Sequence, residues 1–110
     1  MNHTLQKIPA LVREELEAAN REHPAFVDWH QAWAVLKEEV EEAANDLRGI
    51  DLQMEWLWGK VKKQDCEKAA PEINAKNLYD RAVHLAAEAI QVAAMAQKAA
   101  ALAEDEAGPE

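Results

Sequence analysis

The sequence predicts an all-α fold, a four-helix bundle, from its composition and its hydrophobic pattern. Hydrophobic residues make up 49% of the 110 residues, and only 3 glycines are present. Alanine, leucine, glutamate, lysine and glutamine dominate, and these residues are good helix formers. Apolar positions recur every three or four residues over long stretches, which is the period of an amphipathic helix. A chain of this length has room for one hydrophobic core.

The first helix is expected within residues 4–21, starting close to Pro9, because proline is tolerated only near the first turn of a helix. Its apolar positions have helical spacing: Leu5, Ile8, Leu11, Val12 and Leu16. His23 precedes Pro24, and a residue before proline is pushed out of the α region. The helix should therefore end before this pair.

Two further helices are expected in the middle of the chain. The stronger one covers residues 27–48, with Asp28 as its N-cap and Gly49 as the residue just beyond its C-terminus. The next covers residues 51–63, where one face carries Met54, Leu57 and Val61.

The last helix is the longest one that the sequence predicts. Residues 64–71 form a polar connection, and residues 72–103 then have the alanine-rich pattern of one continuous helix. Residues 1–103 are thus expected to form a single all-helical domain. Residues 104–110 are expected to be a flexible acidic C-terminal tail.

The net charge restricts the class of ligand. With 21 acidic and 12 basic residues the formal charge is −9, which repels a nucleic-acid backbone, so we expect no nucleic-acid partner. An acidic protein can still bind a small phosphorylated molecule if a divalent cation lies between the two sets of negative charges.

The sequence also argues against membrane insertion and secretion. It has no signal-peptide pattern at the N-terminus and no apolar run long enough to span a bilayer, so we expect a cytoplasmic protein without a membrane partner. Cys66 is the only cysteine, which excludes an internal disulfide bond and leaves no zinc-ligand spacing.

Acidic residues follow one edge of the apolar stripe on the helix at 27–48. At about 100° per residue, this stripe consists of Trp29, Trp33, Leu36, Val40, Ala43 and Leu47. Glu39 and Glu42 lie together on one flank, whereas Glu38 points further toward water. Asp28 and Asp46 lie in the same line as that pair.

The last helix repeats this arrangement. Its apolar stripe consists of Leu78, Ala82, Leu85, Ala89, Val92 and Ala96, and the matching flank carries Asn77, Arg81, His84, Glu88 and Gln91. Packing the two stripes together brings the polar flanks face to face. Clustered carboxylates repel one another unless they share a cation, and Mg²⁺ prefers such oxygen ligands. A glutamate-rich run by itself is usually a solvated helix face. A metal site is favoured here because both helices carry polar residues on the flanks that face each other.

Two segments resemble the MazG-like nucleotide pyrophosphohydrolases, especially the short forms of phages and mobile elements. These segments are residues 30–42 and 88–96. The family carries Glu-Glu-x-x-Glu on one helix and Glu-x-x-Asp on a later one. The first motif is complete here at Glu38, Glu39 and Glu42, and the second is present as Glu88-Ala-Ile-Gln91, with glutamine in place of aspartate and a long separation between the two motifs.

The resemblance implies an all-helical homodimer or homotetramer that hydrolyses nucleoside triphosphates to monophosphate and pyrophosphate. It implies Mg²⁺ as the cofactor, with Mn²⁺ as a substitute, held by Glu39, Glu42 and Glu88. Gln91 would be a weaker, neutral ligand. Glu38 is the expected catalytic residue, positioning or deprotonating the attacking water.

Three further side chains are weaker candidates for substrate binding. His84 lies one turn before Glu88, Arg81 is on the same flank, and Lys60 belongs to the densest basic cluster. A lone histidine beside an apolar stripe is more often structural, and lysines at a helix end commonly complement its dipole.

The last helix has a second apolar face, opposite the first, formed by Val83, Ala87, Ile90 and Ala94. Burial of both faces predicts a homo-oligomer. Two alternatives to an enzyme stay open: a MazG-like helical oligomer that has lost activity and acts as an interaction or regulatory protein, which Gln91 favours, and an acidic helical adaptor without a metal site.

Overall fold

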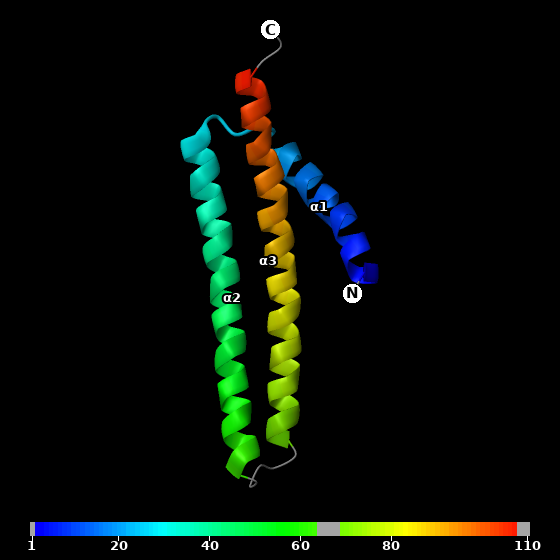
Figure 1. The fold of residues 1–110 in the computed structure, drawn as a ribbon, viewed down its shortest axis with the longest axis vertical. Helices are drawn as coiled ribbons and strands as arrows, with labels where there is room; N and C mark the ends of the chain where they lie inside the picture. Colours follow the sequence, from blue (N-terminus) through cyan, green and yellow to red (C-terminus); the bar gives the residue numbers. More distant parts are fainter. Residues whose placement is uncertain (1, 64–68, 108–110) are drawn as a thin grey trace.

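The computed structural model describes residues 2–63 and 69–107, which form three helices (Figure 1). They are α1 (Asn2–Glu22), α2 (Trp29–Lys63) and α3 (Ala69–Ala107). Helices α2 and α3 run side by side as a long antiparallel hairpin, and α1 packs against the C-terminal half of α3. The molecule measures 70 × 30 × 23 Å. The predicted all-α class is confirmed, and no described helix is long and apolar enough to cross a membrane.

The predicted break at Gly49 is wrong, because α2 continues through it and joins two of the four expected helices. A glycine inside a helix costs only about 1 kcal/mol, which packing on a neighbouring helix offsets. Gly49 also faces α3 at a close approach: a Cβ atom placed on it would lie 2.8 Å from Cζ of Arg81. This glycine makes room for an arginine and does not end the helix.

Helix α1 begins at Asn2 and therefore contains Pro9, which was expected to start it. Pro9 is exposed, so the carbonyl group that loses its helical partner lies at the solvent-facing side. The helix ends at Glu22, before the His23–Pro24 pair as predicted. The predicted N-cap of α2 is confirmed, since the backbone N–H of Gln31 donates to Asp28 Oδ1 at 2.9 Å.

Helix α3 is longer than predicted at both ends. It begins at Ala69, and it continues to Ala107, past residue 104 where the flexible tail was expected to begin. Residues 108–110 of that tail, and residues 64–68 of the predicted connection with Cys66, lie outside the described residues.

The hydrophobic core is small and lies at the end of the hairpin where α1 packs. Its buried members are Val12, Phe26, Ala32, Ala94, Met95, Ala99 and Leu102. The Lys98 ammonium donates to the His23 carbonyl and lies 4.8 Å from the centre of the Phe26 ring, so it fixes the α1–α2 connection. The radius of gyration is 19.0 Å, whereas a compact domain of this length has about 13 Å.

Helices α2 and α3 meet along a seam with heptad spacing. On α2 the less exposed residues alternate at intervals of three and four: Ala32, Leu36, Glu39, Ala43, Asp46, Ile50, Gln53, Leu57 and Lys60. This spacing is typical of a coiled coil. The predicted α2 stripe shares Leu36 and Ala43 with this seam, but its other members lie off the seam or are exposed, and Trp33 is 65% exposed. On α3, the second apolar face is partly covered by α1, because Ile90 packs on the core and Ala94 is part of it.

Candidate metal centre

In each heptad two positions face the α2–α3 seam. One of these two positions is polar in successive heptads. On α2 it is occupied by Glu39, Asp46, Gln53 and Lys60, and on α3 by Asn74, Arg81 and Glu88. We call these seven residues the polar row. The other seam position is mostly apolar, and on α2 it carries Leu36, Ala43, Ile50 and Leu57. The apolar residues of the seam hold the two helices together, and the polar row aligns functional groups along the hairpin.

Three carboxylates meet where Glu88 faces α2. One carboxylate oxygen each of Glu39, Glu42 and Glu88 lies within 4.8 Å of the others. We call these three residues the carboxylate cluster. Glu88 of α3 and the pair Glu39 and Glu42 of α2, which the sequence predicted to face each other, are thus brought together. Glu88 is only 8% exposed, so water screens little of the repulsion at its carboxylate.

Burial and mutual repulsion raise the pKa of two of these groups. The pKa of Glu88 lies above its ordinary value of 4.5, first because burial penalises its charge, and then because it shares a hydrogen bond with Glu42. The pKa of Glu39 is also raised, first by burial and then by the charges of Glu42, Glu38 and Glu15. Without a cation, the cluster therefore retains a proton more readily than free carboxylates do.

Gln91 closes one side of the cluster. With its amide nitrogen toward the carboxylates, it donates to Glu39 Oε2 at 2.9 Å and to Glu88 Oε2 at 3.2 Å. The amide thus supplies hydrogen-bond donors that partly compensate the negative charge. The four ligands predicted from sequence are therefore neighbours.

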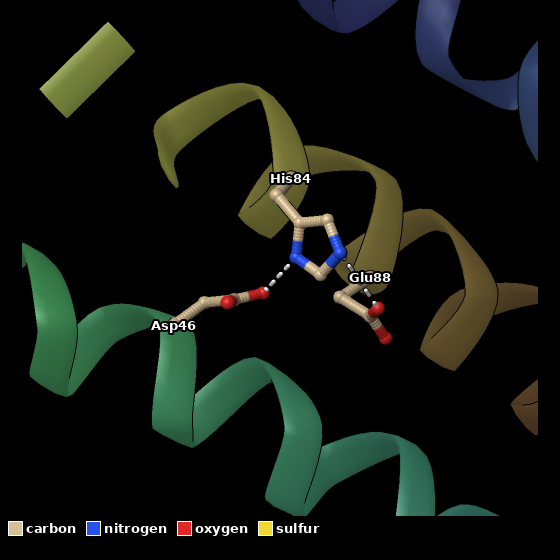
Figure 2. Close-up of side chains that lie close together, drawn as sticks. All are labelled: Asp46, His84 and Glu88. Atoms are coloured by element: carbon tan, nitrogen blue, oxygen red, sulfur yellow. Dashed lines mark hydrogen bonds and ion pairs between the residues drawn. The ribbon is translucent and has the colours of Figure 1, made fainter. Parts of the chain in front are cut away.

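A histidine joins the cluster to a fourth carboxylate (Figure 2). His84 Nδ1 lies 2.6 Å from Asp46 Oδ2, and its Nε2 lies 3.8 Å from Glu88 Oε1. The imidazole ring thus lies between a carboxylate of α2 and one of α3. The hydrogen bond with Asp46 is the main cause of a raised His84 pKa, and the charges of Asp46, Glu88 and Glu42 add to it.

Asp46, His84 and Glu88 form a second group whose ligand atoms lie within 4.8 Å of one another, and Glu88 belongs to both groups. The carboxylate cluster offers only oxygen atoms as metal ligands, which suits Mg²⁺ or Mn²⁺. The donor set at the cluster therefore fits the predicted cofactor. Asp46 was aligned with the glutamates in the sequence but was not expected to contribute to the site. Its spacing of one heptad from Glu39 is the signal that identifies it.

The chain matches no protein-family model, and it has no match among curated proteins or solved structures.

The other predicted site residues lie around or beyond the cluster. Glu38 is exposed beside Glu39, so it lies at the solvent edge. Arg81 lies two helical turns from Glu88 along the polar row, with its guanidinium against Gly49. Lys60 is not part of the cluster: its Nζ lies 5.4 Å from the centre of the Trp56 ring, near the other end of the hairpin. The structure therefore does not bring Lys60 together with the predicted metal ligands.

Proposed function

We propose that this protein is a Mg²⁺-dependent nucleoside triphosphate pyrophosphohydrolase of the MazG-like kind. The observation that supports this most is the convergence of Glu39, Glu42 and Glu88 within 4.8 Å across two helices. Such a group is unfavourable without a cation, because the negative charges repel and one of them is buried. Its ligand set is the one that the sequence motifs assign to Mg²⁺ in that family.

Mg²⁺ or Mn²⁺ would be held by the cluster, where it neutralises the triphosphate and makes a bound water more acidic. Gln91 can turn its amide by 180° and present its carbonyl oxygen instead of its nitrogen. Glu38, at the solvent edge, takes the proton of the water that attacks the α-phosphorus. The bond from this phosphorus to the bridging oxygen breaks, which releases pyrophosphate and leaves the nucleoside monophosphate.

Two side chains of α3 are the candidates for contact with the substrate. His84, between Asp46 and Glu88, donates a hydrogen bond toward an incoming phosphate when it is protonated, or holds the Asp46 carboxylate in position. Arg81 supplies a permanent positive charge further along the polar row.

We also propose that the bundle is completed by a second copy of the chain, as a homodimer or homotetramer. Trp33, Val40 and Leu47 are exposed on α2 and lie off its seam with α3. Among the described residues no large side chain is fully buried, so one chain buries little apolar surface. The α2–α3 hairpin of a second chain, packed on this α2 face, would complete a bundle of four long helices.

The test is pyrophosphate release from a panel of ribo- and deoxyribonucleoside triphosphates with Mg²⁺. Glu39→Gln and Glu42→Gln should each reduce kcat at least a hundredfold. Glu41→Gln is the matched control, because Glu41 lies on the same helix but pairs with Lys37 at 3.4 Å, outside the cluster. Release that survives both cluster changes, or falls equally with Glu41→Gln, refutes the site.

A non-catalytic helical oligomer is the second candidate, and the Gln91 contacts favour it. Its amide already compensates Glu39 and Glu88 without a cation. In that case Gln91→Asp should not create pyrophosphate release, whereas in a weakened enzyme it should raise the activity by adding the anionic ligand of the family motif. Absence of Mg²⁺-dependent release in both the wild type and Gln91→Asp would support this second function.

A further inference from the structure

The imidazole ring of His84 presents one of its two nitrogens to the carboxylate cluster. Its Nδ1 lies 2.6 Å from Asp46 Oδ2. Its Nε2 lies on the other side of the ring, 3.8 Å from Glu88 Oε1 (Figure 2). A separation of 3.8 Å is too long for a hydrogen bond, and Nε2 accepts none from the residues that the structure describes. This nitrogen is therefore available to a ligand that enters between the ring and Glu88.

The separation of Nε2 and Oε1 suits a metal ion held between them. Zn²⁺ forms bonds of about 2.0 to 2.2 Å to histidine nitrogen and to carboxylate oxygen, so two ligand atoms of one ion lie about 3 to 4 Å apart. The 3.8 Å between Nε2 and Oε1 falls within this interval. His84 and Glu88 are also spaced i,i+4 on α3, so their side chains leave the helix on the same side.

Asp46 holds the ring in the tautomer that a metal ion requires. In a neutral imidazole one nitrogen carries the proton and the other carries a lone pair. When Nδ1 donates its proton to Asp46, the lone pair is on Nε2, on the side of Glu88. Histidines that bind metals almost always donate their other ring nitrogen to such a partner. Asp46 is therefore a positioning residue for His84.

The carboxylate cluster supplies the other ligands. Oxygens of Glu39, Glu42 and Glu88 lie within 4.8 Å of one another. Gln91 contacts Oε2 of Glu88, which leaves Oε1 of the same carboxylate open toward His84. The side chain of His84 is 63% exposed, so a hydrated ion can reach the site from solvent.

We propose that His84 Nε2, Glu88 and Glu42 bind a divalent transition-metal ion of the Zn²⁺ class, in a site of mixed nitrogen and oxygen ligands. Imidazole suits Zn²⁺, whereas Mg²⁺ takes oxygen ligands, so Zn²⁺ uses His84 and Mg²⁺ does not. Because both ions use Glu42 and Glu88, Zn²⁺ displaces Mg²⁺ and inhibits hydrolysis. This inhibition rests on the proposed function, but the binding of Zn²⁺ does not.

The test is calorimetric titration of the full chain with ZnCl₂ and, separately, with MgCl₂. A pH of about 8 is suitable, because protons then compete less for the imidazole. His84→Ala should weaken Zn²⁺ binding at least tenfold and leave Mg²⁺ binding unchanged. Asp46→Asn should weaken Zn²⁺ binding about tenfold through the orientation of the ring. His30→Ala is the matched control, because His30 is exposed on α2 and outside both groups of possible metal ligands, and it should change neither affinity.

NMR of the ¹⁵N-labelled histidine rings identifies the atom that binds. One equivalent of Zn²⁺ should shift the Nε2 signal of His84, while Nδ1 keeps its proton and the His30 signals stay in place. Circular dichroism should show an intact helical fold for His84→Ala, since this side chain is largely exposed. Unchanged Zn²⁺ affinity in His84→Ala, equal losses of Zn²⁺ and Mg²⁺ affinity, or Zn²⁺ bound at Nδ1 overturns the proposal.

The proposed site and the proposed reaction fail in different ways. Mg²⁺-dependent pyrophosphate release, together with equal Zn²⁺ affinity in the wild type and His84→Ala, overturns the nitrogen ligand and leaves the reaction intact. Zn²⁺ binding that depends on His84, without any pyrophosphate release, supports the site and refutes the reaction. Where release is observed, half-inhibition of His84→Ala should require at least ten times more Zn²⁺ than that of the wild type, and equal inhibition overturns the competition at Glu88.

Discussion

His84 Nδ1 lies 2.6 Å from Asp46 Oδ2, a contact that joins α3 to α2 across 38 residues of sequence. On its other side the same ring approaches Glu88, whose carboxylate belongs to the carboxylate cluster. When it is protonated, the imidazole therefore supplies positive charge between two helices that both present negative charge. A change in its protonation alters the repulsion across the hairpin.

The first prediction is that the metal-free protein becomes more stable as the pH is lowered. The pKa of His84 is raised above 6.5, and those of Glu39 and Glu88 above 4.5. Each group thus binds protons more tightly in the folded state, so folding is favoured at low pH and the stability is lost as the pH rises through the folded-state values. In EDTA the melting temperature should fall from about pH 5 to about pH 8.

Circular dichroism melts at several pH values measure this dependence. Glu88→Gln should flatten the curve, because it removes one of the three groups whose pKa is raised. A melting temperature that rises with pH over the same interval would contradict the prediction.

The second prediction is that divalent cations stabilise the folded protein. A ligand that binds only the native state adds about 2.7 kcal/mol when its concentration is a hundred times its dissociation constant. Mg²⁺ and Mn²⁺ at millimolar concentrations should therefore raise the melting temperature at pH 8. Glu88→Gln should abolish the increase, whereas Glu41→Gln should retain it, because Glu41 lies outside the cluster.

The sequence predicted the helical class and the meeting of Glu39, Glu42 and Glu88, because carboxylates at helical spacing on two packed helices must share a side. It did not predict the register of the seam. A wheel of 3.6 residues per turn drifts by about 20° per heptad relative to a coiled-coil seam. The predicted stripe included Trp29 and Trp33 because large apolar side chains are usually buried, but both are exposed in this hairpin.

The third prediction compares the two glycines of α2. A Cβ atom at Gly59 meets nothing within 4 Å, so Gly59→Ala should stabilise the helix by about 0.5 to 1 kcal/mol. The same change at Gly49 requires the flexible end of the Arg81 side chain to move, so part of that gain should be lost. Urea denaturation gives both values. Equal stabilisation by the two substitutions would show that the close approach of Arg81 to Gly49 is unimportant.

The fourth prediction concerns Lys98, which connects the α1 end of the molecule to the core. Its ammonium is buried, donates to the His23 carbonyl and lies over the Phe26 ring. Lys98→Met retains the length and apolar stem of the side chain but removes the charge, which leaves that carbonyl without its donor. The free energy of unfolding should fall by about 1 to 2 kcal/mol.

Lys98 lies where α1, the α1–α2 connection and α3 meet. Its substitution should therefore destabilise α1 more than the rest of the hairpin. Hydrogen exchange of α1 amides should accelerate in Lys98→Met, while the amides around Glu42 and Glu88 keep their protection. Lys76→Met is the control, since Lys76 is exposed on the same helix and should change neither measurement. Uniform acceleration along all three helices would instead mean that α1 and the hairpin unfold as one unit, and that the carboxylate cluster depends on the distant core for its geometry.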